Sequence, residues 1–92
     1  MSSEPSQVRF PLGQILYTGN ALARLRTEEL LTALPRHAQG DWGDLYPEDA
    51  IANDIALQQG GRLLSAYGFE QSRFWVITLA DRSRTIVLTP ED

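Results

Sequence analysis

The spacing of apolar positions changes once along the chain, and the change separates a helical half from a strand half. Between residues 20 and 59 apolar side chains recur every three or four positions, the period of a helix with one buried face. From residue 62 onward the period is two, as in a strand. This order predicts an α+β fold in which helices precede a sheet.

The first helical run begins after Asn20, whose side chain can cap the start of a helix. Thr27, which two glutamates follow, offers a competing start, so the run can also form two short helices. Pro35 lacks a backbone N–H and is expected to end regular helix near Leu34. It can itself begin a further turn, which Gly40 would close.

The next helix is predicted to begin at Pro47, because proline fits the first position of a helix. Glu48 and Asp49 follow it and suit the positive end of the helix dipole. Gly60 and Gly61 stop the helix. Its sequence pattern places five residues on one face, namely Ile51, Ala52, Ile55, Ala56 and Gln59.

Three strands are predicted after the helices, over residues 62–69, 73–80 and 85–89. The links between them are short enough for hairpins, so the strands would form a three-stranded antiparallel meander. Before the helices, residues 8–18 are expected to be extended, with a bend and a short strand over 15–17. The predicted fold is therefore α+β, with an N-terminal extended segment, two to three short helices and the meander.

Both faces of the predicted meander are apolar in part. Phe74 and Val76 point to one side of the second strand, whereas Trp75, Ile77 and Leu79 point to the other. A sheet with one face in water should alternate more cleanly between apolar and polar residues. Either other segments cover both faces, or one face is an interface with a partner or with a second copy.

The length of 92 residues makes one domain the upper limit. We expect that domain over residues 8–92 and a flexible tail over the polar residues 1–7. A hydrophobic content of 42% excludes wholesale disorder, and the lack of cysteine excludes disulfides and thiolate sites. The longest apolar run covers only residues 74–77, so we expect a cytoplasmic protein without a membrane span or signal peptide.

All eight basic residues are arginines, and the excess negative charge gathers in one segment. Residues 37–61 contain no arginine and carry a formal charge of −5, against −4 for the whole chain. This sign argues against direct nucleic-acid binding, which needs basic side chains for the phosphates. It suits a basic protein partner, such as a nucleic-acid-binding host complex, although an acidic surface can also serve solubility alone. The acidic residues are Asp41, Asp44, Glu48, Asp49 and Asp54.

Trp42 lies inside this acidic segment, between an aspartate and a glycine. It can be a lid over the edge of the core or an exposed anchor for a partner. We favour the lid, because so small a core cannot readily spare a tryptophan. Together with the five acidic residues it forms the candidate partner-binding site. Arg82 and Arg84, at the last hairpin, are alternative phosphate contacts, although arginines in turns are mostly solvated.

No combination of residues matches a known catalytic or metal-binding motif. His37, Asp41 and Asp44 lack the alternating oxygen ligands of a cation-binding loop. His37 can in principle act as a base for Ser65 or Ser83, but there is no G-x-S-x-G turn, and Ser65 lies inside a predicted strand. We therefore expect a protein without catalytic residues, a metal or a cofactor.

Several stretches of the chain resemble a widespread family of short bacterial proteins from plasmids and integrative elements. Some members carry the label "type I restriction endonuclease subunit M", but this chain is far too short for a methyltransferase domain. The resemblance implies an accessory gene of a mobile element and no active site. It rests on FPLGQIL (10–16), RHAQGDWGDL (36–45), EDAIANDIAL (48–57), GRLLSAY (61–67), WVIT (75–78) and ADRSRTIVLTPED (80–92).

The leading hypothesis is a non-enzymatic protein-interaction module of a bacterial mobile element. Its role would be to inhibit a host defence complex, as an anti-restriction or anti-CRISPR protein, by placing the acidic segment on a positively charged nucleic-acid surface. The alternative is a dimeric DNA-associated regulator or antitoxin-like protein that uses Arg24, Arg26 and Arg36, or the last hairpin, against phosphate.

Overall fold

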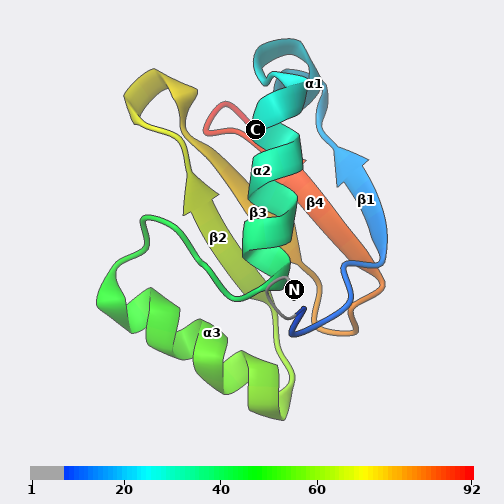
Figure 1. Cartoon of the computed structure of the whole chain (residues 1–92), viewed down its shortest axis with the longest axis vertical. Helices are drawn as coiled ribbons and strands as arrows, with labels where there is room; N and C mark the ends of the chain where they lie inside the picture. The colour runs from blue at the N-terminus through cyan, green and yellow to red at the C-terminus, as the bar shows by residue number, and fades with distance from the viewer. Residues whose placement is uncertain (1–7) are drawn as a thin grey trace, which may run out of the picture.

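The computed structural model describes residues 8–92, whose four strands form one sheet (Figure 1). The strands are β1 (Gln14–Tyr17), β2 (Leu63–Tyr67), β3 (Phe74–Thr78) and β4 (Arg84–Leu88). They lie side by side in the order β1-β4-β3-β2. The pairs β2–β3 and β3–β4 are antiparallel, whereas β1 runs parallel to β4.

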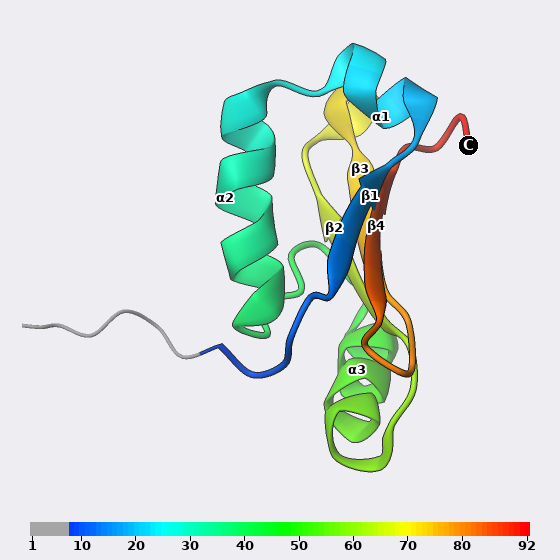
Figure 2. The same cartoon turned by 90° about the vertical axis from the view of Figure 1, so that its right-hand side faces the viewer.

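Three α-helices flank the sheet: α1 (Gly19–Arg24), α2 (Thr27–Ala38) and α3 (Pro47–Gln59). Figure 2 shows α2 along one face of the sheet, α1 above its upper end and α3 at its lower end. A 3₁₀ turn, η1 (Glu70–Ser72), joins β2 to β3. Within residues 8–92 no helix stands over the opposite face, so one side of the sheet is left open.

The α+β class and the antiparallel meander are confirmed, but the sheet has four strands and is mixed. The short N-terminal strand pairs with β4, which places Ile15 opposite Thr85. Gly13 allows this close approach, because its φ is 68° and a Cβ there would collide with the carbonyl group of Ser83. A strand of four residues carries no pattern that could specify so distant a partner.

The helical run after β1 divides at residues 25–26, so the alternative with two short helices is the observed one. Thr18 caps α1, and its hydroxyl accepts the N–H of Ala21 at 3.1 Å. Asn20, the expected cap, is instead the second residue of α1. Asparagine is on average the better cap, but β1 ends at Tyr17, and Thr18, the next residue, takes the extended cap position.

α2 continues through Pro35 to Ala38, although the sequence predicts an end near Leu34. Proline removes only the hydrogen bond to the carbonyl of Leu31, one turn earlier. Leu31 is 68% exposed, on the side of the helix where water can replace the missing donor. The last turn carries buried His37 and Ala38, so packing against the sheet keeps it helical.

α3 has the predicted limits, but only part of the predicted shared face packs. Ala56 is buried as predicted, together with Asn53, and Leu57 packs against the same core. Ile51 and Ile55, also predicted on that face, are 58% and 51% exposed. Small residues on the packed side let α3 approach the edge of β2 closely, and the two isoleucines point outward.

Two groups of apolar side chains form the core. The first lies between α2 and the sheet and consists of Ala21, Ala33, Tyr67, Phe74, Val76 and Val87. The second lies toward α3 and consists of Phe10, Trp42, Ala56 and Leu63. No helix within residues 8–92 is long and apolar enough to cross a bilayer. The tail predicted over residues 1–7 lies outside the described residues.

Asn53 joins α3 to the outer edge of the sheet and is 3% exposed. Its Oδ1 accepts the N–H of Leu64 at 3.0 Å, and its Nδ2 donates to the carbonyl of Leu64 at 2.7 Å. Farther along β2, the N–H of Ala66 donates to the carbonyl of Trp42, and the carbonyl of Ala66 accepts the N–H of Asp44. The backbone groups of this edge strand are thus satisfied by side-chain and loop contacts rather than by another strand.

Replacement of Asn53 should therefore loosen α3 from the sheet. Asn53→Ala is expected to lower the free energy of unfolding by about 2–3 kcal/mol, because two buried backbone groups of Leu64 lose their partners. Urea unfolding followed by circular dichroism measures the change. Asn20→Ala, the same substitution at an exposed position, should cost less than about 0.5 kcal/mol. Equal losses in the two variants would contradict the role of Asn53.

Candidate partner-binding surface

Trp42 lies in the core, with only 7% of its surface accessible. Its indole stacks on the ring of Phe10 at a centroid distance of 6.1 Å and meets the ring of His37 at 5.7 Å. Its Nε1–H donates to Oδ1 of Asp54 at 3.3 Å. Trp42 is therefore the lid that we favoured, and its place among the partner-binding residues is corrected, because a side chain so buried offers no anchor.

The aspartates on either side of Gly43 are paired with arginines from other parts of the chain. Arg36 binds Asp41 with N–O distances of 2.7 and 3.1 Å, and this contact holds the pKa of Asp41 below its ordinary value. Arg73 lies 3.5 Å from Asp44, a looser pair. Exposed ion pairs add little stability, but each arginine offsets one negative charge of the segment.

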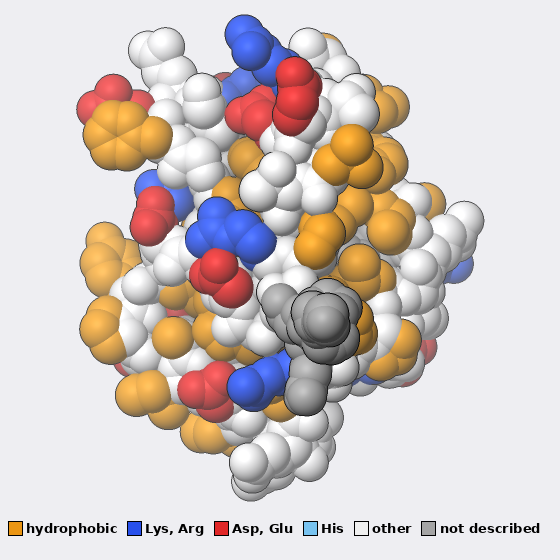
Figure 3. All heavy atoms as spheres, in the orientation of Figure 1, with side chains coloured by type: hydrophobic (Ala, Val, Ile, Leu, Met, Phe, Trp, Pro, Cys, Tyr) orange, Lys and Arg blue, Asp and Glu red, His pale blue; other side chains and the backbone are white. Residues whose placement is uncertain are grey.

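The other acidic residues of the segment are dispersed. Glu48 and Asp49 are exposed in the first turn of α3, and within the described residues no arginine pairs with them. Asp54 is bonded to Trp42. Figure 3 shows the side that carries α2, where acidic and basic side chains lie next to one another. Tertiary folding thus breaks the acidic run into pairs and leaves a smaller acidic rim, Glu48 and Asp49.

Arg82 is used inside the fold. Its guanidinium donates to three backbone carbonyls at 2.6, 3.1 and 3.2 Å, those of Gly61, Leu79 and Ala56. These contacts tie the last turn of α3 to the hairpin between β3 and β4. Arg84, the other alternative phosphate contact, is exposed at the start of β4.

A chain of buried hydrogen bonds centres on His37, which is 0% exposed. Nδ1 lies 2.5 Å from Oγ of Ser65, and Nε2 lies 2.9 Å from Oγ1 of Thr78. Thr78 is bonded in turn to Thr85 at 2.6 Å, and the hydroxyl of Thr85 donates to the carbonyl of Leu12 at 2.7 Å. The network joins α2, three strands and the N-terminal segment.

The carbonyl at the end of this network fixes the direction of the bonds on the Nε2 side of the ring, because a carbonyl only accepts. Thr85 donates to it, so Thr78 donates to Thr85, and Nε2–H of His37 donates to Thr78. Burial, with a smaller contribution from Arg82, lowers the pKa of His37 to about 4. The ring is therefore neutral at ordinary pH, with its proton on Nε2, and Nδ1 accepts from the hydroxyl of Ser65.

The contact between Ser65 and His37 has the distance of a nucleophile and its base. Ser65 is also 0% exposed, however, and the second nitrogen of the ring is held by a hydroxyl rather than by a carboxylate. A nucleophile acts only where a substrate can reach it. The geometry is that of a buried hydrogen-bond network that holds α2 against the sheet.

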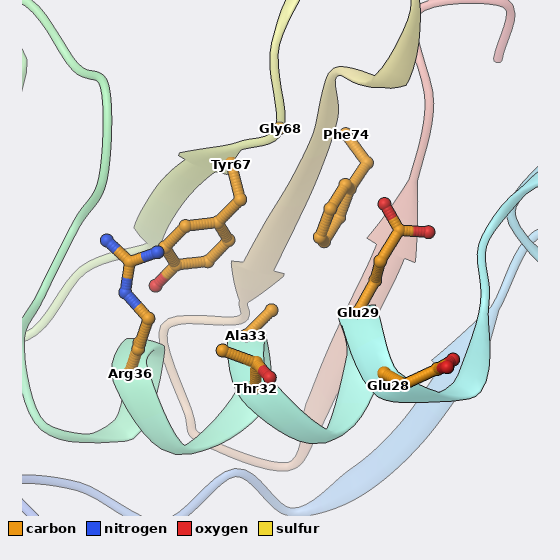
Figure 4. Close-up of a pocket in the computed structure, with 8 residues that line it drawn as sticks. All are labelled: Glu28, Glu29, Thr32, Ala33, Arg36, Tyr67, Gly68 and Phe74. Carbon is orange, nitrogen blue, oxygen red and sulfur yellow. The ribbon is translucent and has the colours of Figure 1, made fainter.

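A groove of about 310 Å³ runs between α2 and the adjoining ends of β2 and β3 (Figure 4). The rings of Tyr67 and Phe74 line it on the sheet side. The guanidinium of Arg36 lies 4.6 Å from the centre of the Tyr67 ring at one end, and Glu28 and Glu29 lie toward the other. Such a groove can take a side chain with an apolar stem.

Three polar groups of this groove already have partners within the fold. Arg36 is bonded to Asp41, and Glu29 accepts the backbone N–H of Arg26 at 2.8 Å. The hydroxyl of Tyr67 donates to the carbonyl of Asp41 at 2.5 Å, and burial raises the pKa of Tyr67 to about 12. These contacts stabilise the start of α2 and the loop after it.

The open side of the sheet carries a continuous apolar surface. The strand register aligns Leu16 with Ile86, Ile86 with Ile77, and Ile77 with Leu64, so one aliphatic row crosses all four strands. Each of these side chains is partly exposed, whereas Val76 on the other side is 0% exposed. We define the outer sheet face as Leu16, Leu64, Trp75, Ile77, Ile86 and Leu88.

A hollow of about 300 Å³ lies where the outer sheet face meets the loop before α3. Leu64 and Trp75 line it from the sheet, and Tyr46, which is 74% exposed, lines it from the loop. Asp44 and Asp49 also border it. The apolar surface therefore continues onto the loop and carries negative charge along that side.

The sequence indicated part of this surface but missed the buried network. Strand alternation predicts that Trp75 and Ile77 point to the same face of the sheet, opposite Phe74 and Val76. The signal for the network was present in the same alternation, because Ser65, Thr78 and Thr85 occupy inward positions of their strands. Hydroxyl groups at such positions require a buried partner, and His37 supplies it.

Comparison of the chain with protein-family models, with curated proteins and with solved structures finds no match. The resemblance to a family from mobile elements therefore stays a prediction, and we infer function from the geometry of the molecule.

Proposed function

We propose that this chain is a non-enzymatic protein-interaction module whose outer sheet face is covered by another protein chain. The observation that carries the proposal is the aliphatic row from Leu16 to Leu64, which crosses the sheet without a layer of described residues over it. Domains ordinarily bury each apolar face of a sheet against another layer. A continuous uncovered apolar face often marks an interaction site.

The hydrogen-bonding groups that could do chemistry support a binding role over a catalytic one. Ser65 and His37 are both 0% exposed. In the groove beside α2, Arg36 and Glu29 are bonded within the fold. The partly exposed outer sheet face has no such internal partners, because its side chains are aliphatic or aromatic.

The finer role that the resemblance suggests, inhibition of a host defence complex, belongs to this proposal as a second step. Glu48 and Asp49 are exposed in the first turn of α3, where Asp49 borders the hollow at the outer sheet face, and they would attract a basic host protein at long range. Contacts with DNA phosphate receive less support, because four of the eight arginines have partners within the fold. The arginines with such partners are Arg24, Arg36, Arg73 and Arg82.

Affinity capture from the bacterial host tests the proposal. Tagged wild-type chain, expressed together with untagged chain, should retain at least one protein at moderate salt, whether a host protein or the untagged copy. Ile77→Glu places a charge at the centre of the outer sheet face and should reduce that retention at least tenfold. Leu31→Glu makes the same charge change on the outer side of α2 and should retain the protein.

A melting curve for each variant distinguishes a folded variant that no longer binds from a variant that has unfolded. If the tagged wild-type chain retains neither a host protein nor the untagged copy, the proposal fails. It also fails if Ile77→Glu retains as much protein as wild type does. Ile77→Thr keeps a β-branched residue in β3 and serves where Ile77→Glu does not fold.

A further inference from the structure

We infer that the chain covering the outer sheet face is a second copy of this protein, packed face to face about a two-fold axis. This inference rests on the proposed function, since it names the partner of the same surface. It is carried by the composition of the face, by its dimensions and by the distribution of charge around it.

The centre of the outer sheet face contains no charged residue. The aliphatic row is followed by a second row in which Trp75 lies opposite Leu88. Interfaces between identical subunits are more apolar than those of transient complexes, and charged residues are depleted at their centres. A two-fold axis places the same patch on both sides of the interface, so the apolar face of one copy packs against the equally apolar face of the other.

The broad side of the molecule is large enough for the interface of a stable dimer, of which the strands themselves supply less than half. The protein measures 33 × 32 × 25 Å, and Figure 1 looks down the shortest axis, so the sheet lies parallel to the broad side. A standard interface removes about 800 Å² from each partner, which is roughly one seventh of the accessible surface of 5723 Å². Four strands of about five residues project about 300 Å². The remainder would come from the surrounding broad side, including exposed Tyr46.

Sheet-on-sheet packing gives this dimer a definite geometry. Two stacked sheets lie about 10 Å apart, with their strands within about 30° of one another. Ile77 and Ile86 lie opposite one another on β3 and β4, the two central strands, so they fall nearest the axis. Leu16 and Leu64 lie on the edge strands and close the sides of the new core.

The charges around the face carry both signs. Arg84 begins β4, in the strand alternation that also places Ile86 and Leu88 on the outer face. Asp44 and Asp49 border the hollow at the β2 side, where Arg73 also lies and pairs with Asp44, so Asp49 is the unpaired charge there among the described residues. Two copies of a chain with a net charge of −4 therefore do not meet through surfaces of a single sign. Residues 1–7, MSSEPSQ, fit the face poorly, because Met1 is their only large apolar side chain.

Sedimentation equilibrium on the full chain tests the inference directly. Wild-type protein should behave as a species of about twice 10.3 kDa at concentrations near 50 μM, about what a micromolar dissociation constant requires. Ile77→Glu buries one charge per copy at the centre and should weaken dimerisation about a hundredfold or more. Leu31→Glu should dimerise as wild type does.

A cross-linking experiment provides a second readout that does not depend on a disruptive variant. The chain has no cysteine, so Ile86→Cys introduces a single thiol near the axis. A bismaleimide that spans about 10 Å should join two such copies in high yield. Leu31→Cys, on the outer side of α2, should remain uncoupled at the same concentration.

A monomeric wild-type protein at about 100 μM would overturn the inference. So would a dimer that Ile77→Glu leaves intact, since its interface would lie elsewhere. Capture of a host protein that depends on Ile77, together with a monomeric wild type, would refute only the second copy and leave the proposed function standing. Failure of both experiments would refute both.

Discussion

Acidification from pH 6.5 to pH 4 should cost this protein about 3 kcal/mol of folding stability through His37 alone. Burial, and to a smaller extent the guanidinium of Arg82, lowers the pKa of His37 from 6.5 to about 4. In that pH window the unfolded chain binds a proton that the folded chain does not. The free energy of unfolding is therefore greatest above pH 6.5 and falls as the pH approaches 4.

The buried position of the ring explains why the folded protein resists this proton. Nδ1 is the nitrogen that would be protonated, because Nε2–H already donates to Thr78. Protonation would reverse the bond with Ser65, whose hydroxyl can also accept, but it would place a positive charge in the core near Arg82. The carboxyls with a lowered pKa, such as that of Asp92 at about 2, add to the loss of stability only below about pH 5, so the change between pH 6.5 and pH 5 reports His37.

Urea unfolding at several pH values between 4 and 7 measures the slope of the free energy of unfolding against pH. His37 is the single histidine of the chain, so its NMR signals can be followed without ambiguity and should show a neutral ring down to about pH 4. His37→Gln removes the titrating group and should flatten the slope in this window while lowering stability throughout. An NMR titration with a midpoint near pH 6.5 would contradict the buried, neutral state.

Trp42→Ala should lower the free energy of unfolding by about 3–5 kcal/mol, a large part of the total for a domain of this size. The substitution removes a side chain that packs on Phe10 and His37 and is 7% exposed. The corresponding fall in melting temperature is about 15–30 °C. It also removes the hydrogen bond to Asp54.

Thermal melts followed by circular dichroism measure this change beside matched controls. Tyr46→Ala removes an aromatic side chain that is 74% exposed, four residues along the same loop, and should cost less than about 1 kcal/mol. Asp41→Asn and Asp44→Asn break exposed ion pairs and should each cost about 1 kcal/mol or less. A Trp42→Ala protein that melts within a degree or two of wild type would exclude the lid.

Local signals in the sequence determined most of the elements. The prolines and glycines around α3 set its limits, and the period of two set β2, β3 and β4 with their hairpins. These features depend on backbone chemistry within a few residues, which the sequence displays directly. Pro35 was the exception, because burial of His37 and Ala38 outweighed the loss of one helix hydrogen bond.

The candidate site depended more strongly on contacts between distant segments. The sequence showed a run of five acids, but only the fold brings Arg36 and Arg73 to two of them and Trp42 to a third. The sequence also showed that Trp75 and Ile77 share a face of the sheet, but it did not show that α2 packs on the opposite face.

By itself, the sequence determined the fold class, the limits of the third helix, the meander and the presence of two apolar sheet faces. Only the tertiary structure decided that β1 pairs with β4, that His37 joins three hydroxyl groups in the core, and that the outer sheet face is left open. The difference lies in the distance along the chain over which each interaction acts. Turn and helix signals act over a few residues, whereas the parallel pairing, the buried network and the choice of covered face join residues as much as seventy positions apart.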